Sequence, residues 1–139
     1  MRLTLPYPPK ELYPNQAKAR AFAGKSAITR TAAAKYRKLV AMSAREQMQL
    51  AIPLVERLMA IEGADISKFP LLGPLSVHLT FVTAAKGGRL PDRDNLVAAF
   101  KAGFDGLTDA GLWHDDFQVE VVGTNIIRGE VASVHLEIT

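Results

Sequence analysis

Cysteine is absent from the 139 residues, and so is any long hydrophobic run. The lack of cysteine excludes disulfide bonds and zinc sites built from thiolates, and it is compatible with life in the cytosol. No segment approaches the roughly 18 apolar residues that a membrane-spanning helix needs. Residues 1–9 hold one arginine and a short apolar stretch cut by prolines, which is not the pattern of a signal peptide. We therefore expect a cytoplasmic protein without a membrane partner.

The motifs of several large enzyme classes are also missing. The sequence has no glycine-rich phosphate loop and no Ser/His/Asp order typical of serine hydrolases. We therefore expect no nucleotide cofactor. Hydrolysis assisted by a metal ion is the one catalytic pattern that the remaining residues indicate.

The length and the hydrophobic content bound the architecture. A chain of 139 residues suits one domain, and 48% hydrophobic residues supply enough material for a core. No internal repeat or low-complexity segment divides it. We expect a single domain over residues 1–139.

Charge is distributed unevenly along the chain. Residues 1–45 hold ten Lys/Arg and one acid, a balance of +9, whereas residues 46–139 hold seven Lys/Arg and thirteen acids, a balance of −6. A basic front and an acidic back suggest an anionic partner held by one part and cations held by another. Lysine-rich helix faces that only meet solvent give a similar pattern, so charge alone leaves the nucleic-acid interpretation open.

Hydrophobic periodicity predicts the element order β-α-β-α-β-β. We expect strands at 3–9, 75–81, 119–126 and 131–138, with residues 128–130 forming a hairpin turn between the last two. We expect a basic loop over residues 10–28. One helix is expected from about Thr31, with restart or kinking at Pro53 and a stop at Gly63. A second is expected from Asp94 to Ala110 before Gly111. This order is typical of an α+β fold, a small mixed sheet with helices packed on it.

The acidic residues of the second half carry the candidate chemistry. Asp92 and Asp94 lie two residues apart at a loop-to-helix junction, and Asp115-Asp116 stands at the entry to the third strand. If that strand lies beside the second strand, its start would approach Asp92 and Asp94. Clustered carboxylates favour a hard ion such as Mg²⁺ or Mn²⁺, which can polarise a phosphodiester. Lys101 is then a candidate to stabilise charge on the phosphate.

Simpler roles for these residues stay open. Asp92 or Asp94 could cap the helix, and Asp115-Asp116 could form a solvated turn. Lys101 and Asp105 are four residues apart, so they could form a surface pair only.

The motif Asp92-Arg93-Asp94-Asn95-Leu96 continues with Lys101, Asp105-Gly106-Leu107, Ala110-Gly111 and Asp115-Asp116. This pattern resembles the signature of the RusA family of Holliday junction resolvases. The opening Leu5-Pro6-Tyr7-Pro8-Pro9, then Pro14-Asn15 and Tyr36-Arg37, is similar to the start of the same family. The resemblance covers the chain from end to end.

The resemblance implies a homodimeric, Mg²⁺-dependent endonuclease that nicks two opposed strands of a four-way DNA junction in recombination and repair. Many members of the family occur in phages and prophages. By the resemblance, Asp92, Asp94 and Asp116 are the catalytic acids, Asp115 adjoins them at the metal, and Lys101 is the functional lysine. A catalytically inactive, phage-derived module that binds branched DNA is the alternative.

Two departures from the better-known family pattern concern spacing. The stretch between Asn95 and Asp105 is about three residues longer, which moves Lys101 about 4.5 Å along a helix. The middle of the chain, residues 44–74, is extended as well, and it has no functional explanation.

Basic residues supply the expected DNA contacts, which set affinity and salt dependence rather than sequence choice. Those expected to bind phosphates are Lys10, Lys18, Arg20, Lys25, Arg30, Lys35, Arg37, Lys38, Lys86, Arg89 and Arg93.

Overall fold

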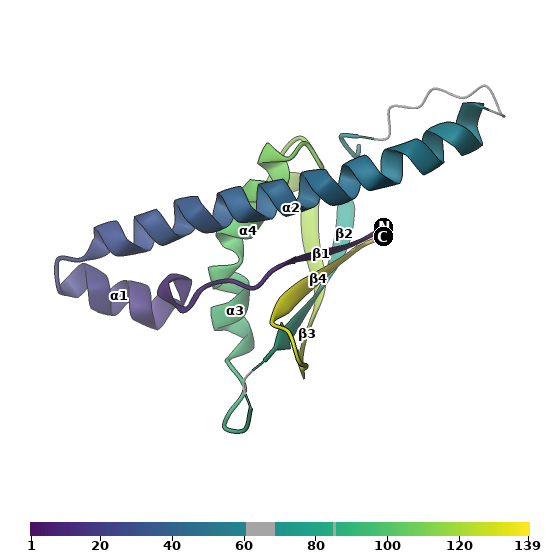
Figure 1. Ribbon diagram of the computed structural model, residues 1–139. Coiled ribbons are helices and arrows are strands. Elements are labelled where there is room, and N and C mark those ends of the chain that lie inside the picture. Colours follow the sequence, from purple (N-terminus) through teal and green to yellow (C-terminus); the bar gives the residue numbers. More distant parts are fainter. Residues whose placement is uncertain (61–68, 85) are drawn as a thin grey trace.

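The computed structural model describes residues 1–60, 69–84 and 86–139, with the side chains of 52–60 excepted. A four-stranded sheet, ordered β1-β4-β2-β3, carries helices on one face (Figure 1). Its strands are β1 (Arg2–Pro6), β2 (Leu75–Thr83), β3 (Val119–Arg128) and β4 (Ser133–Ile138). The expected α+β class and the single mixed sheet are confirmed.

Helices fill the intervals between the strands. They are α1 (Pro14–Phe22), α2 (Ser26–Ala60), α3 (Arg93–Ala99) and α4 (Lys101–Asp109), with short 3-10 helices η1 (Lys10–Leu12) and η2 (Asp116–Gln118). The α2 helix crosses the molecule and packs on α4 and β1. No helix in the described part of the chain is long and apolar enough to cross a membrane.

The core follows the predicted periodicities. Tyr36, Val40, Ala44 and Met48 form a buried stripe on α2, as their helical spacing predicts. The inward residues of β2 alternate with the exposed His78. Aromatic rings join the layers, because Phe100 makes edge-on contacts with Tyr36, Phe81 and Phe104.

The predicted hairpin between the last two strands is wrong. β2 lies between β3 and β4, pairing parallel with β3 and antiparallel with β4. Residues 129–132 therefore carry the chain across the end of β2 instead of forming a tight turn, and Gly129 N–H donates to the carbonyl of Thr83. Turn residues in the sequence indicate a reversal of direction, but they do not say which strand becomes the neighbour.

Two predicted interruptions are also corrected. The basic loop expected over 10–28 is largely helical, with Pro14 in the first turn of α1 and Gly24 in a left-handed conformation (φ +73°) before α2. α2 continues through Pro53 to Ala60, because proline removes only its own donor and the adjoining turns keep theirs. The expected stop of this region at Gly63 lies outside the described residues.

The helix expected from Asp94 to Ala110 is divided at Phe100 into α3 and α4. Gly111, in a left-handed conformation (φ +80°), ends it as predicted.

The exposed edge of β1 is covered by a side chain. Gln47 of α2 accepts a hydrogen bond from Thr4 N–H (2.9 Å) and donates one to Thr4 O (2.7 Å). Its amide thus satisfies both backbone groups of Thr4, which a further strand would otherwise pair with. The opposite edge of the sheet is β3, which among the described strands pairs only with β2.

Candidate active site

Asp92 and Asp94 stand at the start of α3. Asp92 is the N-cap, and its Oδ1 accepts the backbone N–H of Asp94 at 2.9 Å. The capping role left open by the sequence is therefore real for Asp92, and it uses one oxygen of the carboxylate. Both side chains are exposed, and they project from the junction where the loop after β2 enters the helix. A cation in solvent can reach both.

Asp115 and Asp116 lie in a tightly tied turn before β3. The Asp115 carboxylate accepts the N–H of Phe117, and Gln118 Oε1 accepts the N–H groups of His114 (3.0 Å) and Asp115 (3.1 Å). The Gln118 amide also donates to Gly73 O (3.2 Å), which ties the turn to the segment before β2. Both carboxylates are exposed on a turn whose backbone is fixed.

The acids of this turn affect one another. Hydrogen bonding with Asp115 is the largest cause that raises the pKa of Asp116 above its ordinary value, followed by partial burial and by the negative charges of Asp115 and Asp105. The neighbouring carboxylates thus disfavour the charged form of Asp116. A bound cation would relieve the same repulsion.

Asp105 is a third acid at this end that the sequence analysis did not assign to the site. It lies on α4, which packs on η2, and its charge raises the pKa of both Asp116 and Arg37. The sequence offered one signal for a role of Asp105, its position four residues after Lys101 in the motif. That spacing was equally consistent with a surface pair.

The two acid pairs lie at opposite ends of the neighbouring strands β2 and β3. Because β2 and β3 are parallel, Leu75 pairs with Val119 and Thr83 pairs with Arg128. Asp92 comes after the end of β2, whereas Asp116 comes before the start of β3, and α3 with α4 returns the chain between them (Figure 1). Eight steps along β2 at about 3.3 Å each give a strand length of about 26 Å between these two ends.

The expected approach of Asp116 to Asp92 and Asp94 therefore does not occur within one chain. β3 does lie beside β2, but parallel pairing places the two starts together. Among the residues that the structure describes, no group of three His, Asp or Glu side chains is arranged to hold a metal ion. One chain alone thus does not fit a single ion bound by all four aspartates. Lys101 is exposed at the start of α4, between the two ends.

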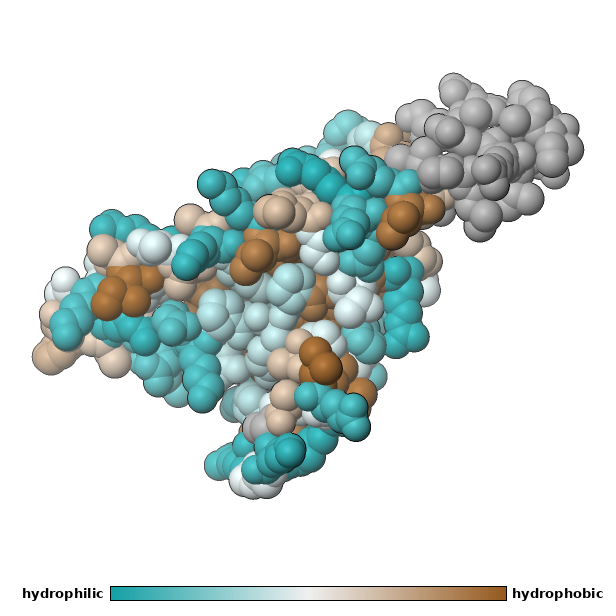
Figure 2. Space-filling view, viewed as in Figure 1, coloured by the Kyte–Doolittle hydropathy of each residue, from teal (hydrophilic) through white to brown (hydrophobic). Residues whose placement is uncertain are grey.

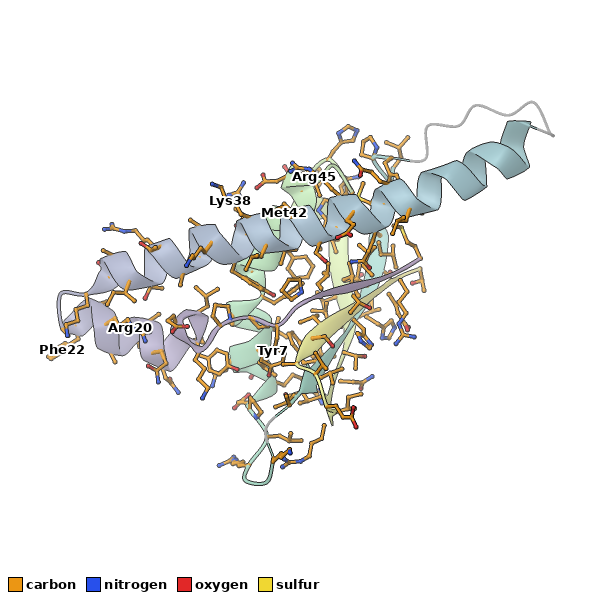
Figure 3. All side chains as sticks on the ribbon, in the orientation of Figure 1. Tyr7, Arg20, Phe22, Lys38, Met42 and Arg45 are labelled. Carbon is orange, nitrogen blue, oxygen red and sulfur yellow. The ribbon has the colours of Figure 1, made fainter. Side chains whose placement is uncertain are left out.

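Most of the predicted phosphate contacts lie on exposed surface. Among them, Lys38 projects from α2 and Arg20 from α1 (Figure 3). The space-filling view shows hydrophilic side chains along α2 with apolar ones between them (Figure 2). The exposed members of the predicted set are Lys10, Lys18, Lys25, Arg30, Lys35, Arg37, Lys38, Lys86, Arg89 and Arg93. Arg20 is half-buried and donates to Glu11 O at 3.4 Å.

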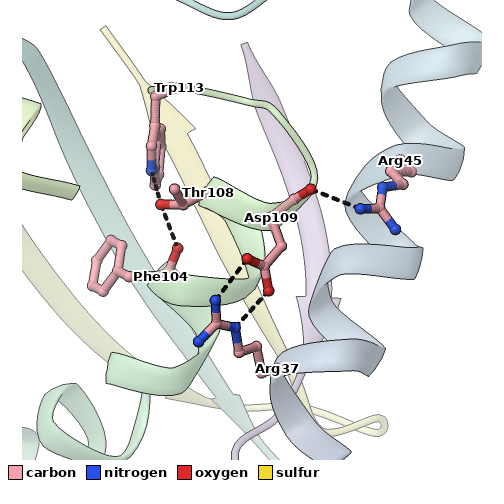
Figure 4. Close-up of polar contacts among 6 residues, drawn as sticks. All are labelled: Arg37, Arg45, Phe104, Thr108, Asp109 and Trp113. Atoms are coloured by element: carbon pink, nitrogen blue, oxygen red, sulfur yellow. Dashed lines mark hydrogen bonds and ion pairs between the residues drawn. The ribbon is translucent and has the colours of Figure 1, made fainter. Parts of the chain in front are cut away.

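Arg37 has an intramolecular partner. Its guanidinium donates two hydrogen bonds to the carboxylate of Asp109, one of them at 2.7 Å, and Arg45 donates to Asp109 O at 2.7 Å (Figure 4). This contact holds the end of α4 against α2, and it lowers the pKa of Asp109. The guanidinium of Arg37 is thus committed to the fold, and the part of Arg45 was missed in the sequence.

Arg128 makes another contact that the sequence did not indicate. At the end of β3 it donates to Gly87 O (3.2 Å) and Gly88 O (2.5 Å). Both glycines have left-handed backbones, which L-residues with side chains rarely adopt. Arg128 thereby holds the loop that carries Lys86 and Arg89 next to the start of α3.

Comparison with protein families gives an independent indication. The model of the family described as endodeoxyribonuclease RusA matches residues 6–139, nearly the whole chain. No curated protein matches the chain significantly. Membership in this family implies nuclease activity on Holliday junctions and binding of branched DNA. The chain belongs to the RusA family of endodeoxyribonucleases.

Proposed function

We propose that this protein is a Mg²⁺-dependent, homodimeric resolvase that cuts Holliday junctions by paired symmetric nicks. The observation that carries the proposal is the family match over residues 6–139. The exposed pairs Asp92/Asp94 and Asp115/Asp116 support it, because they present oxygen donors in positions that solvent and a phosphate can reach. Mn²⁺ is expected to substitute for Mg²⁺.

Asp92, Asp94, Asp115 and Asp116 are the proposed metal-binding residues, and the first two with Asp116 are the proposed catalytic acids. A bound divalent ion would supply Lewis-acid polarisation of the phosphodiester and an acidified water. The chain itself holds the acids in place through the cap of α3 and the Gln118 turn. Lys101 is proposed to stabilise negative charge on the phosphate during cleavage.

The exposed basic residues of α1 and α2 are proposed to bind the junction arms. Lys86 and Arg89, on the loop that Arg128 holds, lie close enough in sequence to Asp92 to draw a strand toward the acids. Contacts of this kind make affinity fall steeply with salt. Two copies related by a two-fold axis would present two such surfaces to opposed strands of a symmetric junction.

A branched-DNA-binding protein without nuclease activity is the second candidate. The observation that favours it is the separation of the two acid pairs within one chain. It predicts tight junction binding that does not depend on a divalent ion. The resolvase predicts paired nicks that disappear when the ion is removed by chelation.

A labelled synthetic four-way junction tests the proposal with Mg²⁺, with Mn²⁺ and with EDTA. We expect paired nicks with either ion and none with EDTA. Asp94→Asn should abolish cleavage and keep or strengthen junction binding, because one negative charge near the phosphate is removed. Glu46→Gln, at an exposed acid on α2, is the matched control and should cut normally. Absence of nicking by the wild-type protein with both ions would overturn the proposal.

A further inference from the structure

Helix α2 carries a second apolar face beside the one that builds the core. Ile28, Ala32 and Leu39 follow one another at helical spacing, with Lys35 between them. Ile28 and Leu39 are 47% and 52% exposed, so the rest of the chain leaves this face partly open. Together with Tyr7 and the segment that enters η1, it lines an open groove of about 610 Å³, which we call the α2–η1 groove. This volume lies within the range of ligand sites.

Two tyrosines give the α2–η1 groove an aromatic wall that is held in place. The Tyr36 hydroxyl donates to Pro6 O at 2.7 Å, and the Tyr7 hydroxyl lies 2.9 Å from Thr83 Oγ1 in a hydrogen bond. Because both hydroxyls already have partners, the two rings offer their apolar atoms to the groove. A fixed aromatic surface loses little conformational entropy when a flat ligand packs on it.

Cations surround the same groove. Lys35 lines it, and the exposed Lys10 stands between two lining residues, Pro9 and Glu11. Arg20 of α1 reaches the edge, where it donates to Glu11 O at 3.4 Å. Among the described residues that line the groove, Glu11 is the one acid. The rim therefore attracts an anion, whereas the interior suits an uncharged ring.

The α2–η1 groove adjoins the end of the sheet that leads to Asp92 and Asp94. Thr83, which hydrogen-bonds with Tyr7 at the groove, is the last residue of β2. η1 and α1 both lie against α3, whose N-cap is Asp92. A DNA strand held at these acids therefore runs close to the groove.

We propose that the α2–η1 groove binds one unstacked nucleobase of the branched DNA, with neighbouring phosphates on Lys10, Lys35 and Arg20. This inference rests on the proposed function and names a subsite for its substrate. Continuous base stacking is interrupted at the branch point of a junction, so a base leaves the duplex there at less cost than within an uninterrupted helix. Packing on protein rings and apolar side chains then replaces the stacking that the base has lost.

The charges around the groove favour a nucleotide over an apolar protein segment. A hydrophobic segment would fill the interior but leave the cations of the rim without counter-charges. A nucleotide supplies a flat ring and an anionic phosphate in one unit, which matches the apolar interior and the basic rim together. Inside the groove, the Glu11 carboxylate can accept an N–H group from the edge of a base, and it repels a phosphate.

Removal of one base from the DNA tests the groove independently of cleavage. Two synthetic four-way junctions differ only at the branch point, where one carries an unpaired dA and the other an abasic residue in its place. Binding is measured in EDTA, so that neither junction is cut. We expect the wild-type protein to bind the abasic junction about tenfold more weakly, because the stacking of one base on the groove is lost. Equal affinities for the two junctions would overturn the proposal.

Leu39→Ser tests whether the base lies in this groove. We expect the variant to keep less than about threefold preference for the junction with the base, because an apolar wall is lost. Leu50→Ser, at a 74% exposed site farther along α2 and outside the groove, is the matched control and should keep the full preference. A Leu39→Ser protein with the full preference would overturn the proposal. If that variant also changed the oligomeric state, a second copy would be the occupant instead.

Lys35→Gln separates the rim from the interior. A lost phosphate contact should weaken binding of both junctions by the same factor and reduce the salt dependence of the affinity by about one charge. The preference for the junction with the base should remain. A preference that disappears with Lys35→Gln but survives in Leu39→Ser would overturn the division into an apolar interior and a charged rim.

Failure of the base-binding groove and failure of the proposed function give different results. A wild-type protein that prefers the junction with the base but makes no nicks with Mg²⁺ or Mn²⁺ would overturn the resolvase and support the groove. A protein that makes paired nicks but binds both junctions equally would overturn the groove alone. Absence of any junction binding would overturn both.

Discussion

Gly106 lies where α4 approaches the backbone of α2 closely, and Gly106→Ala tests how tightly the two helices are packed. A Cβ at this position would lie 2.5 Å from the carbonyl oxygen of Arg37, 3.1 Å from Val40 Cβ and 3.3 Å from Ala41 N. The first neighbour is backbone, so relief requires the helices to move apart. Overpacking of this kind costs about 1–3 kcal/mol.

Helix propensity acts in the opposite direction, since alanine is favoured over glycine inside a helix by about 1 kcal/mol. We expect the packing cost to exceed this gain, so the free energy of unfolding should fall by up to about 2 kcal/mol. The midpoint of thermal unfolding should fall by about 5 °C for a chain of this size. The buried Trp113, the only tryptophan, gives a fluorescence signal for urea titrations.

The sign of the change in the free energy of unfolding tests whether α2 and α4 are tightly packed at Gly106. Ala98→Gly, at an exposed site on α3, calibrates the propensity effect alone and should destabilise by about 1 kcal/mol. If Gly106→Ala stabilised the protein by a similar amount, the close approach of α2 and α4 would be refuted.

Two further predictions concern contacts at the surface of the fold. Gln47→Ala should lower the free energy of unfolding by about 1 kcal/mol and speed hydrogen exchange at the Thr4 amide, because it removes two hydrogen bonds to that backbone; unchanged exchange would contradict the edge cover. Arg37→Ala should cost a few tenths to about 1 kcal/mol at pH 7, as exposed ion pairs do. Because Arg37 lowers the pKa of Asp109 in the folded state, that stabilisation is present above the ordinary aspartate pKa and is lost as pH falls through the lowered value. Urea titrations at pH 7 and at pH 2.5 should therefore show a smaller difference between variant and wild type at the lower pH.

Local patterns predicted the core well. The stripe Tyr36, Val40, Ala44 and Met48 is buried as its spacing requires, and the alternation in β2 places Val77 and Leu79 inside. These patterns succeed because a helix or strand repeats its inward face at a fixed period, whatever packs against it. α1 was missed because it has no buried residue and hence no apolar stripe, and its alanines and Pro14 were weaker signals.

For the candidate site, the sequence supplied the residues but not their arrangement. It identified Asp92, Asp94, Asp115 and Asp116 by motif, and it indicated that they could meet if the third strand lay beside the second. The cap of α3 and the Gln118 turn confirm that both pairs stand at element boundaries. The prediction of their meeting was wrong for one chain, because it depended on the direction in which β3 runs beside β2.

What the sequence determined by itself is thus the family, the periodic faces and the identity of the acids. These depend on residues close together in the chain, or on a motif preserved through it. Only the tertiary structure decided that β2 separates β3 from β4 and that Arg37 is paired with Asp109. It also decided that the acid pairs lie at opposite ends of the parallel strands β2 and β3. Strand order and direction are set by packing between distant segments, and such long-range choices leave little trace in local periodicity.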